Sequence, residues 1–292
     1  MNLTSPSQVK AWCIENGFHP NKVLGQNFLI DRNALEAIVD AGLAGISADR
    51  LPGAEILEIG PGLGVLTEEM LRRGCSVTAV EKDPVLAARL AESLGNPPNL
   101  RVVEADALDW ISRSPIPVPT PLATACAARF ARGIRSPFAA MVSNLPYQAG
   151  TRILLELVQR REIPSMTVLV QTEVAERLAA KEGSKTRGLA GVWAQLDYDV
   201  KIVRKVAASC FWPRPEIGSS VVTLARHDRN IALSDVERAV FRRLTKKAFE
   251  HRRKQLGSIF KDLIQSSARA EELTNEDWIN LSKGIAENEE DA

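Results

Sequence analysis

The segment Ala54–Gly64 constrains the fold more than any other stretch of this 292-residue chain. Its first part, Ala54–Ile59, is an apolar run typical of a buried parallel strand. Alternating glycines follow from Gly60 to Gly64, and apolar residues then recur at helical spacing in 65–71. Glycine allows a sharp turn and the close approach of a ligand. The segment therefore predicts the first strand–turn–helix crossover of a nucleotide-binding α/β domain.

The glycine spacing indicates which ligand class this turn accepts. A dinucleotide fingerprint needs Gly or Ala where this chain has Val65, which argues against a dehydrogenase. The observed G-x-G-x-G, preceded by the acidic Glu58, resembles the loop of S-adenosylmethionine-dependent methyltransferases. Taken alone, the loop also fits a glycine turn with only a packing role.

Acidic residues follow the next two predicted strands. Glu81 comes after the strand 76–80, and Asp106 comes shortly after the strand 100–104. The carboxyl ends of parallel strands meet at one edge of the sheet. Because a carboxylate accepts hydrogen bonds and donates none, Glu81 suits ribose hydroxyls and Asp106 suits the amino group of adenine. Either acid alone is more typical of a helix cap or a surface charge, but two of them at successive strand ends after a glycine loop favour a ligand site.

The tetrapeptide Asn144–Tyr147 is the most informative one in the chain. It follows a predicted strand, 138–143, and so lies at the same edge of the sheet. The carbonyl oxygen of Asn144 can accept from an exocyclic amine, and Tyr147 can stack on a planar base. Pro146 stiffens the turn between them. A turn with a buried tyrosine is the alternative.

Together these motifs resemble those of the ribosomal RNA adenine N6,N6-dimethyltransferases, the KsgA/RsmA kind. The matching segments are Gln26-Asn27-Phe28-Leu29, Glu58-Ile59-Gly60-Pro61-Gly62, Glu81, Asp106, Asn144-Leu145-Pro146-Tyr147, Phe211-Trp212-Pro213-Arg214-Pro215, Gly218–Val222 and Ala248–Lys254. They run in the family's order from about residue 22 to 260. The chain departs from the family at Gln148–Thr151, at Glu216, where a lysine is common, and in a longer insert at 112–137.

The resemblance implies an α/β fold class. We expect a Rossmann-like S-adenosylmethionine-dependent methyltransferase domain over residues 1–227, interrupted by the Pro/Ala-rich insert 112–137. Its mostly parallel seven-stranded sheet should have an antiparallel last strand. Residues 228–292 should form a small, all-helical, RNA-contacting domain. By propensity alone, the segment 22–29 and the Pro-rich Phe211 segment are loops.

The resemblance also assigns site residues. Those expected to bind the methyl donor are Asn27, Leu29, Gly60, Gly62, Glu81, Asp106 and Asn144. Those expected to act on the target are Asn144, Leu145, Pro146, Tyr147 and Phe211. Tyr147 and Phe211 would sandwich the target adenine. S-adenosylmethionine is the expected cofactor, and no metal is required.

The implied reaction is dimethylation of N6 in two adjacent adenosines near the 3′ end of small-subunit (16S) ribosomal RNA. The expected partner is this RNA in the pre-30S particle, and the protein is expected to be a cytoplasmic monomer without a membrane partner. Two alternatives stay open. One is a large-subunit ribosomal RNA adenine N6-methyltransferase, and the other is a non-catalytic ribosome-assembly factor of the same fold.

Charge and composition are compatible with that partner. Net charge is only +1, but residues 200–269 carry 16 Lys and Arg against 6 Asp and Glu, a local field that attracts phosphates. A solvated helix face is the alternative. The four cysteines form no C-x-x-C pair, which argues against a structural zinc site. No apolar run approaches the ~18 residues of a membrane span, and Met1–Lys10 lacks the order of a signal peptide.

Overall fold

The structure is a computed structural model that describes residues 1–21, 25–113, 137–230, 233–261 and 263–290. It divides into two compact units, one made of residues 1–175 and 201–226 and the other of 176–200 and 227–292. The chain therefore passes between the units more than once. No sequence pattern predicted the boundary between residues 175 and 176. Of the predicted insert 112–137, residues 114–136 lie outside the described residues.

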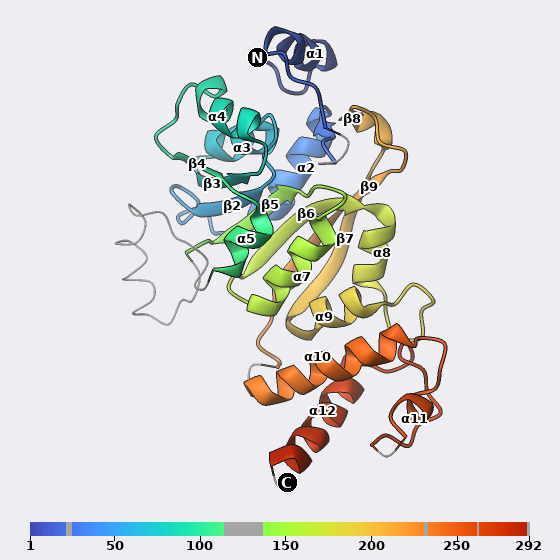
Figure 1. Cartoon of the computed structure of the whole chain (residues 1–292). Helices are drawn as coiled ribbons and strands as arrows, with labels where there is room; N and C mark the ends of the chain where they lie inside the picture. The colour runs from blue at the N-terminus through green and yellow to red at the C-terminus, as the bar shows by residue number, and fades with distance from the viewer. Residues whose placement is uncertain (22–24, 114–136, 231–232, 262, 291–292) are drawn as a thin grey trace. The chain divides into compact units, whose positions relative to one another are not determined.

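A seven-stranded sheet forms most of the first unit (Figure 1). In sheet order its strands are β4 (Leu100–Glu104), β3 (Ser76–Glu81), β2 (Glu55–Ile59), β5 (Ala140–Asn144), β6 (Ser165–Gln171), β9 (Ser219–Arg226) and β7 (Tyr198–Val206). The strands from β4 to β6 pair in parallel, whereas β9 runs antiparallel to β6. The predicted mostly parallel sheet with an antiparallel last strand is confirmed.

The helices in this part of the chain are α1 (Pro6–Glu15), α2 (Arg32–Leu43), α3 (Val65–Arg72), α4 (Pro84–Ser93), α5 (Ala107–Ser112), α7 (Gly150–Arg160) and α8 (Thr172–Ala179). Of these, α3, α4, α5 and α7 connect parallel strands, and α2, α3 and α4 pack on the sheet (Figure 1). Side chains fix several of their starts. The carboxylate of Asp31 accepts from the backbone of Ala34 to cap α2, and Asp83 accepts from the backbone of Val85 to cap α4. Local sequence therefore decides where these helices begin.

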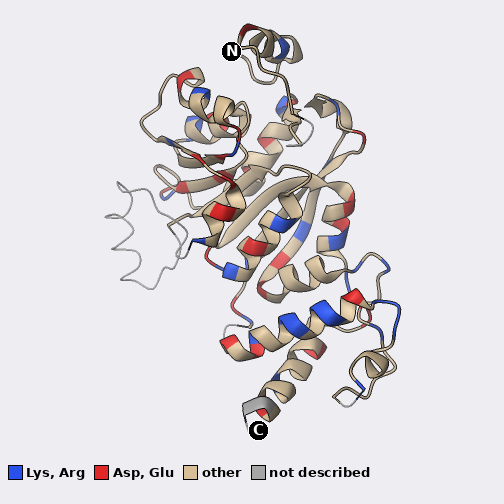
Figure 2. Ribbon diagram, in the orientation of Figure 1, with Lys and Arg blue, Asp and Glu red and all other residues tan. Residues whose placement is uncertain are grey.

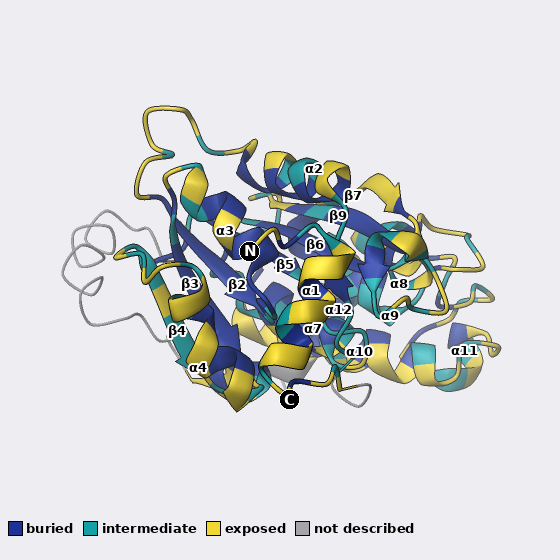
Figure 3. Cartoon of the chain, turned by 90° about the horizontal axis from the view of Figure 1, so that it is seen from above, coloured by how far each residue is buried: buried dark blue, intermediate teal, exposed yellow. Residues whose placement is uncertain are grey.

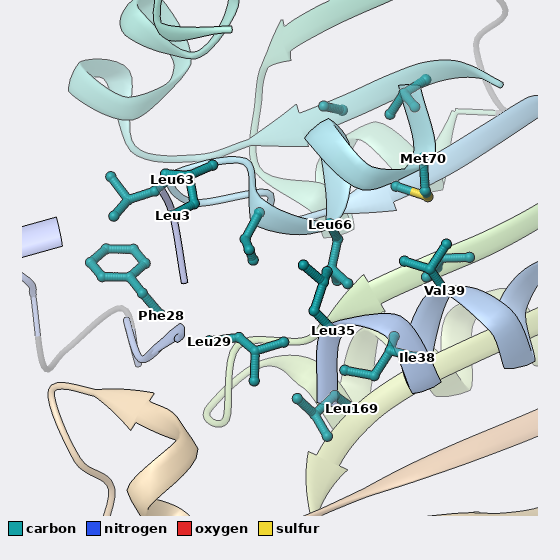
Figure 4. Packing of buried hydrophobic residues seen from close by; sticks show 14 of the residues in the cluster. Leu3, Phe28, Leu29, Leu35, Ile38, Val39, Leu63, Leu66, Met70 and Leu169 are labelled. Atoms are coloured by element: carbon teal, nitrogen blue, oxygen red, sulfur yellow. The ribbon is translucent and has the colours of Figure 1, made fainter. Parts of the chain in front are cut away.

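The core of this unit lies between the sheet and its helices. Every residue of β2 is buried, as expected for a central parallel strand covered on both faces (Figure 3). Leu66 and Met70 of α3 pack with Leu35 and Val39 of α2 in one apolar cluster (Figure 4). Burial of this cluster holds the glycine turn, which lies directly before α3, against the sheet.

A second, two-stranded sheet joins segments that lie far apart in the chain. β1 (Phe28–Leu29) pairs antiparallel with β8 (Phe211–Trp212), and the ring of Phe28 stacks on that of Trp212 with centroids 6.5 Å apart. The prediction of loops was therefore wrong at Phe28–Leu29 and Phe211–Trp212, and its residues 22–24 lie outside the described residues. A two-residue strand is too short to show an alternating pattern, so only long-range pairing defines it.

Apart from connecting segments, one isolated bridge and the first residues of β7, the described residues of the second unit are helical. Its complete helices are α9 (Leu189–Asp197), α10 (Asp235–Glu250), α11 (Leu256–Ile259) and α12 (Asn275–Glu290). Trp278 and Phe241 centre its apolar core. Arg238 donates two hydrogen bonds to the buried carboxylate of Asp197, at 2.7 and 3.0 Å, and so joins α10 to α9. Within the described part of the chain, no helix is long and apolar enough to cross a membrane.

Candidate functional site

The glycine turn after β2 passes close to two other predicted motifs. Gly60 and Gly62 have positive φ angles of 69° and 59°, which side-chain-bearing residues rarely adopt. A Cβ on Gly62 would lie 3.1 Å from the ring of Phe28, and one on Gly60 would lie 3.4 Å from Pro146. The positive φ angles therefore favour glycine at both positions, and at Gly62 the nearby ring of Phe28 adds a steric reason.

A cavity of about 220 Å³ opens beside this turn in the first unit. The predicted site residues that line it are Asn27, Leu29, Gly60, Gly62, Glu81, Asp106, Asn144, Leu145, Pro146 and Tyr147. They come from the carboxyl ends of four parallel strands and from the segment around β1. The edge of the sheet thus brings together residues spread over 120 positions of sequence, from Asn27 to Tyr147.

Glu81 forms the floor of the cavity at the end of β3. Its carboxylate accepts from the backbone N–H of Gly62 at 3.1 Å and of Asp83 at 2.9 Å. Only 7% of the residue is exposed, and this burial raises the pKa of its carboxyl group. Asp83 in turn accepts from the side chain of Gln26 at 2.9 Å. Glu81 is thus fixed beside the glycine turn. Through Asp83 it is also linked to the segment that leads into β1.

Asp106 lies at the end of the neighbouring strand and has both oxygens engaged. One oxygen caps α5 by accepting from the backbone N–H of Leu108 at 2.8 Å, and the other pairs with Lys82 Nζ at 2.8 Å. The Lys82 ammonium lowers the pKa of the Asp106 carboxyl group. Lys82 also lines the cavity, so its ammonium occupies an oxygen of the carboxylate that the sequence predicted for the adenine amine.

Asn144 ends β5 with its side chain held by the predicted motif around residue 27. Its amide nitrogen donates to the carbonyl oxygen of Asn27 at 3.1 Å. That bond orients the amide, and no donor among the described residues bonds its carbonyl oxygen. The oxygen is the group that the sequence predicted to receive an exocyclic amine.

Tyr147 lies two residues beyond the buried Leu145 and is held at its phenolic end. Its hydroxyl is 2.7 Å from the hydroxyl of Ser219, the first residue of β9. Burial raises the pKa of this phenol. Tyr147 lines the cavity together with Asn144, so the site contains an aromatic residue beside the amide.

Glu58 is the fully buried acid that precedes the glycine turn. It is 1% exposed and accepts from the Thr67 hydroxyl at 2.6 Å. Desolvation, with a smaller contribution from the nearby Glu81, raises the pKa of Glu58 to about 8. The residue therefore carries its proton at neutral pH and ties β2 to α3 as a neutral group.

Phe211 is the one predicted site residue that the structure does not place at the cavity. It is 2% exposed and belongs to the apolar core, where β8 pairs with β1 opposite Leu29. Its role in stacking on the target base stays a prediction. In this arrangement Phe211 supports the wall of the cavity from behind.

Several residues at the cavity were not singled out by sequence reasoning. Leu3 is 4% exposed and lies with Leu63 and Phe28 at one end of the core cluster (Figure 4). It lines the cavity although it is far from every motif. In the sequence, Lys82 has no feature that distinguishes it from a solvated lysine. Nothing in the local sequence of Leu3 signals this position.

The cavity fits a nucleoside methyl donor. Backbone glycines leave room where side chains would intrude, the buried Glu81 offers acceptors for hydroxyls, and apolar residues surround them. S-adenosylmethionine would be held by Glu81, Asp106 and the backbone near Gly60. Among the described residues, no group of three or more His, Cys, Asp or Glu side chains is placed to hold a metal ion.

Curated relatives match this chain over most of its length. A ribosomal RNA small subunit methyltransferase A from Deinococcus radiodurans is 42% identical over 222 residues, covering 76% of this chain and 67% of that protein. The protein of the same name from Geobacillus thermodenitrificans is 37% identical and covers 87% of this chain and 80% of its own length. The protein of this name from Leuconostoc citreum is 32% identical and covers 98% of this chain and 90% of its own length.

Solved structures share the fold. A dimethyladenosine transferase from Plasmodium falciparum superposes with a TM-score of 0.69 at 21% identity, covering 89% of this chain and 98% of that one. The 23S rRNA methyltransferase ErmE gives a TM-score of 0.62 at 24% identity, with 88% and 98% covered. The family model described as ribosomal RNA adenine dimethylase matches residues 17–289. This chain therefore belongs to the ribosomal RNA adenine dimethylase family.

Proposed function

We propose that this protein transfers methyl groups from S-adenosylmethionine to N6 of two adjacent adenosines near the 3′ end of small-subunit ribosomal RNA. The observation that carries the proposal is the oriented amide of Asn144 in the same cavity as Glu81 and Asp106. Its carbonyl oxygen is an acceptor for an amine, next to a site suited to a nucleoside. The curated relatives of this chain are named for the small subunit, which favours that RNA over the large-subunit alternative.

The mechanism depends on positioning. S-adenosylmethionine, when bound, supplies an electrophilic methyl group. The adenine amine is a poor nucleophile because its lone pair is delocalised into the ring. Asn144 Oδ1 and the Leu145 carbonyl would accept its two hydrogens, which favours a pyramidal nitrogen with the lone pair directed at the methyl group. Holding both reactants in this geometry supplies most of the rate enhancement.

The target base must leave its stack to enter the cavity. Extrusion costs a few kcal/mol and is least in single-stranded RNA. Stacking on Tyr147 would return about 1–3 kcal/mol. A single-stranded or loop adenosine is therefore the expected substrate.

We further propose that the helical region after residue 228 contacts RNA through exposed cations of α10 and the turn that follows it. Lys246, Arg253 and Lys254 are exposed there, and Figure 2 shows Lys and Arg along α10. Arg252 differs, because it donates to the carbonyl of Lys185 at 2.6 Å and lies 3.5 Å from Glu271. It serves to hold the loop before α9 and is not a free cation.

Replacing Lys246, Arg253 and Lys254 by Gln tests this interface. A plot of log affinity against log salt concentration has a negative slope. Each lost phosphate contact should make this slope less steep by about 0.7–0.9. The matched control replaces Lys10, Arg50 and Arg101, which are exposed on the first unit and remove the same charge. Equal effects of the two triple variants would show that net charge, and not this surface, attracts the RNA.

A labelling experiment tests the reaction itself. The protein is incubated with methyl-labelled S-adenosylmethionine and undermethylated small subunits, large subunits or naked RNA, and the modified nucleotide is mapped. We expect dimethyladenosine in small-subunit RNA alone. Label in large-subunit RNA would favour that alternative, and donor binding without any labelled product would favour the non-catalytic assembly factor. We also expect a monomer by light scattering and a cytoplasmic location.

A further inference from the structure

Ser219 is a buried serine whose hydroxyl reaches the aromatic residue of the cavity. It is 1% exposed, and its Oγ lies 2.7 Å from Tyr147 Oη. It stands in β9, opposite Gln171 of β6, so the sheet fixes its backbone. A hydroxyl on a rigid strand thus meets the tip of a side chain that belongs to a turn.

Tyr147 is also confined near its backbone. A Cβ added to Gly25 would lie 3.2 Å from the backbone nitrogen of Tyr147, so the chain before β1 passes directly beside it. The tyrosine is therefore held at its base by close packing and at its tip by one hydrogen bond. A ring held at both ends has little rotational freedom about its two side-chain torsions.

We infer that Ser219 is a positioning residue that sets the plane of the Tyr147 ring for the incoming adenine; this rests on the proposed function. Stacking requires two rings to lie parallel, and fixing one of them beforehand removes an ordering cost from target binding. Without the bond, the ring samples orientations that face the base edge-on. Ser219 does not line the cavity, so it acts through Tyr147 alone.

The neighbouring Ser220 provides a matched control. It is 0% exposed, and its hydroxyl lies 3.1 Å from that of Thr172. Consecutive residues of a strand point to opposite faces, so Ser220 has an equally buried hydroxyl bond without contacting Tyr147. Ser219→Ala and Ser220→Ala therefore make the same chemical change in the same strand.

Fluorine NMR gives a readout that does not depend on activity. The chain contains only two tyrosines, Tyr147 and Tyr198, so uniform 3-fluorotyrosine labelling yields two assignable signals. We expect Ser219→Ala to change the chemical shift and the line width of the Tyr147 signal, because the ring then samples more orientations. The Tyr198 signal should stay unchanged. Ser220→Ala should leave the Tyr147 signal in place. An unaltered Tyr147 signal in Ser219→Ala would overturn the inference.

Kinetics provide the second arm of the test. We expect Ser219→Ala to lower kcat/KM for RNA about five- to tenfold, the usual size of one hydrogen bond, with unchanged affinity for the methyl donor. Tyr147→Phe should show the same loss, and the double variant should lose no more. Additive losses, or equal losses in Ser220→Ala, would mean that Ser219 acts only on stability.

The two arms separate this inference from the proposed function. A wild-type protein that methylates no RNA would overturn the function, and the fluorine signal would still decide whether Ser219 orients Tyr147. An active wild type with identical Ser219→Ala kinetics and spectra would leave the function standing and remove the role of Ser219.

Discussion

The donor side and the target side of the cavity are built in different ways. Glu81 and Asp106 lie at the ends of adjacent parallel strands, and Gly60 lies at the end of the strand beside them. The predicted target residues Tyr147 and Phe211 come from a turn and from β8, and β8 pairs with β1, the strand of the predicted donor residue Leu29, more than 180 positions away. Regular sheet geometry thus places Gly60, Glu81 and Asp106, whereas Leu29 and Phe211 depend on a short long-range contact. The predicted aromatic pair is divided accordingly: Tyr147 borders the cavity and Phe211 is buried.

Phe211→Ala should have the largest effect on stability. Removing a buried aromatic ring from this core should cost about 3–5 kcal/mol of the free energy of unfolding, measured by urea denaturation. Tyr147→Ala, at a partly exposed position, should cost much less. A stable Phe211→Ala protein that had lost RNA methylation would instead place Phe211 at the target base and break the contrast between the two aromatics.

Asn144→Ala should abolish most methyl transfer and spare donor binding. Losing one oriented polar group at the reacting centre costs about 10²–10³-fold in kcat. The Asn144→Asp variant serves as a control, because it keeps an acceptor oxygen and loses the donation to the Asn27 carbonyl. Single-turnover methylation and calorimetry with the donor measure the two effects separately. Wild-type turnover in Asn144→Ala would remove this residue from the chemistry.

Glu58→Gln should change how stability depends on pH. Burial raises the pKa of Glu58 from 4.5 to about 8, so the folded protein retains a proton that the unfolded chain releases. The stability contributed by this proton is complete below pH 4.5 and is lost as the pH rises through about 8. Gln is always neutral and still accepts from Thr67, so its advantage over wild type should grow to a few kcal/mol across this window. If the difference in unfolding free energy between the two proteins stayed constant from pH 5 to 9, this prediction would be wrong.

Glu81→Gln should weaken the donor side specifically. Hydrogen bonds to a charged acceptor contribute about 1.5–3 kcal/mol, so the Kd for S-adenosylmethionine should rise roughly 10–100-fold. Glu104→Gln is the matched control, because Glu104 is an exposed acid paired in register with Glu81 on the next strand. Calorimetry that gave both variants the same donor affinity would show that Glu81 does not hold the ribose.

Lys82→Met should have the smallest effect, and it should strengthen donor binding, whereas Glu81→Gln should weaken it. The Lys82 side chain is 60% exposed, so its pair with Asp106 is worth at most about 1 kcal/mol. Removing the ammonium frees an oxygen of Asp106 for the donor's adenine, and donor affinity should rise a few-fold. The gain should shrink at high salt, which already screens the pair in wild type. Weaker donor binding by Lys82→Met would mean that Lys82 supports the adenine and does not compete with it.

The second unit offers a related contrast between neighbouring cations. The basic run Arg252–Lys254 predicts a single RNA-binding cluster, but only part of it is free. Arg252 is occupied by Lys185 and Glu271, whereas Arg253 and Lys254 are exposed. A charge run in the sequence therefore overstates the charge that a phosphate would meet.

The sequence by itself determined the sheet and the glycine turn, and it predicted the cluster of polar residues at one edge of the sheet. Strand periodicity located Glu81, Asp106 and Asn144, and the rule that parallel strands end at one edge brought them together. These features depend on local pattern and on regular pairing, both of which are readable from one chain.

Only the tertiary structure decided the β1–β8 pairing, the burial of Phe211 and the bonds from Ser219 and Lys82. Each depends on two segments that meet across the fold, and each involves one or two residues, too few to carry a periodic signal. A serine or a lysine has the same local signature whether it faces solvent or holds a catalytic neighbour. The residues that hold the site are therefore visible only once the chain has folded.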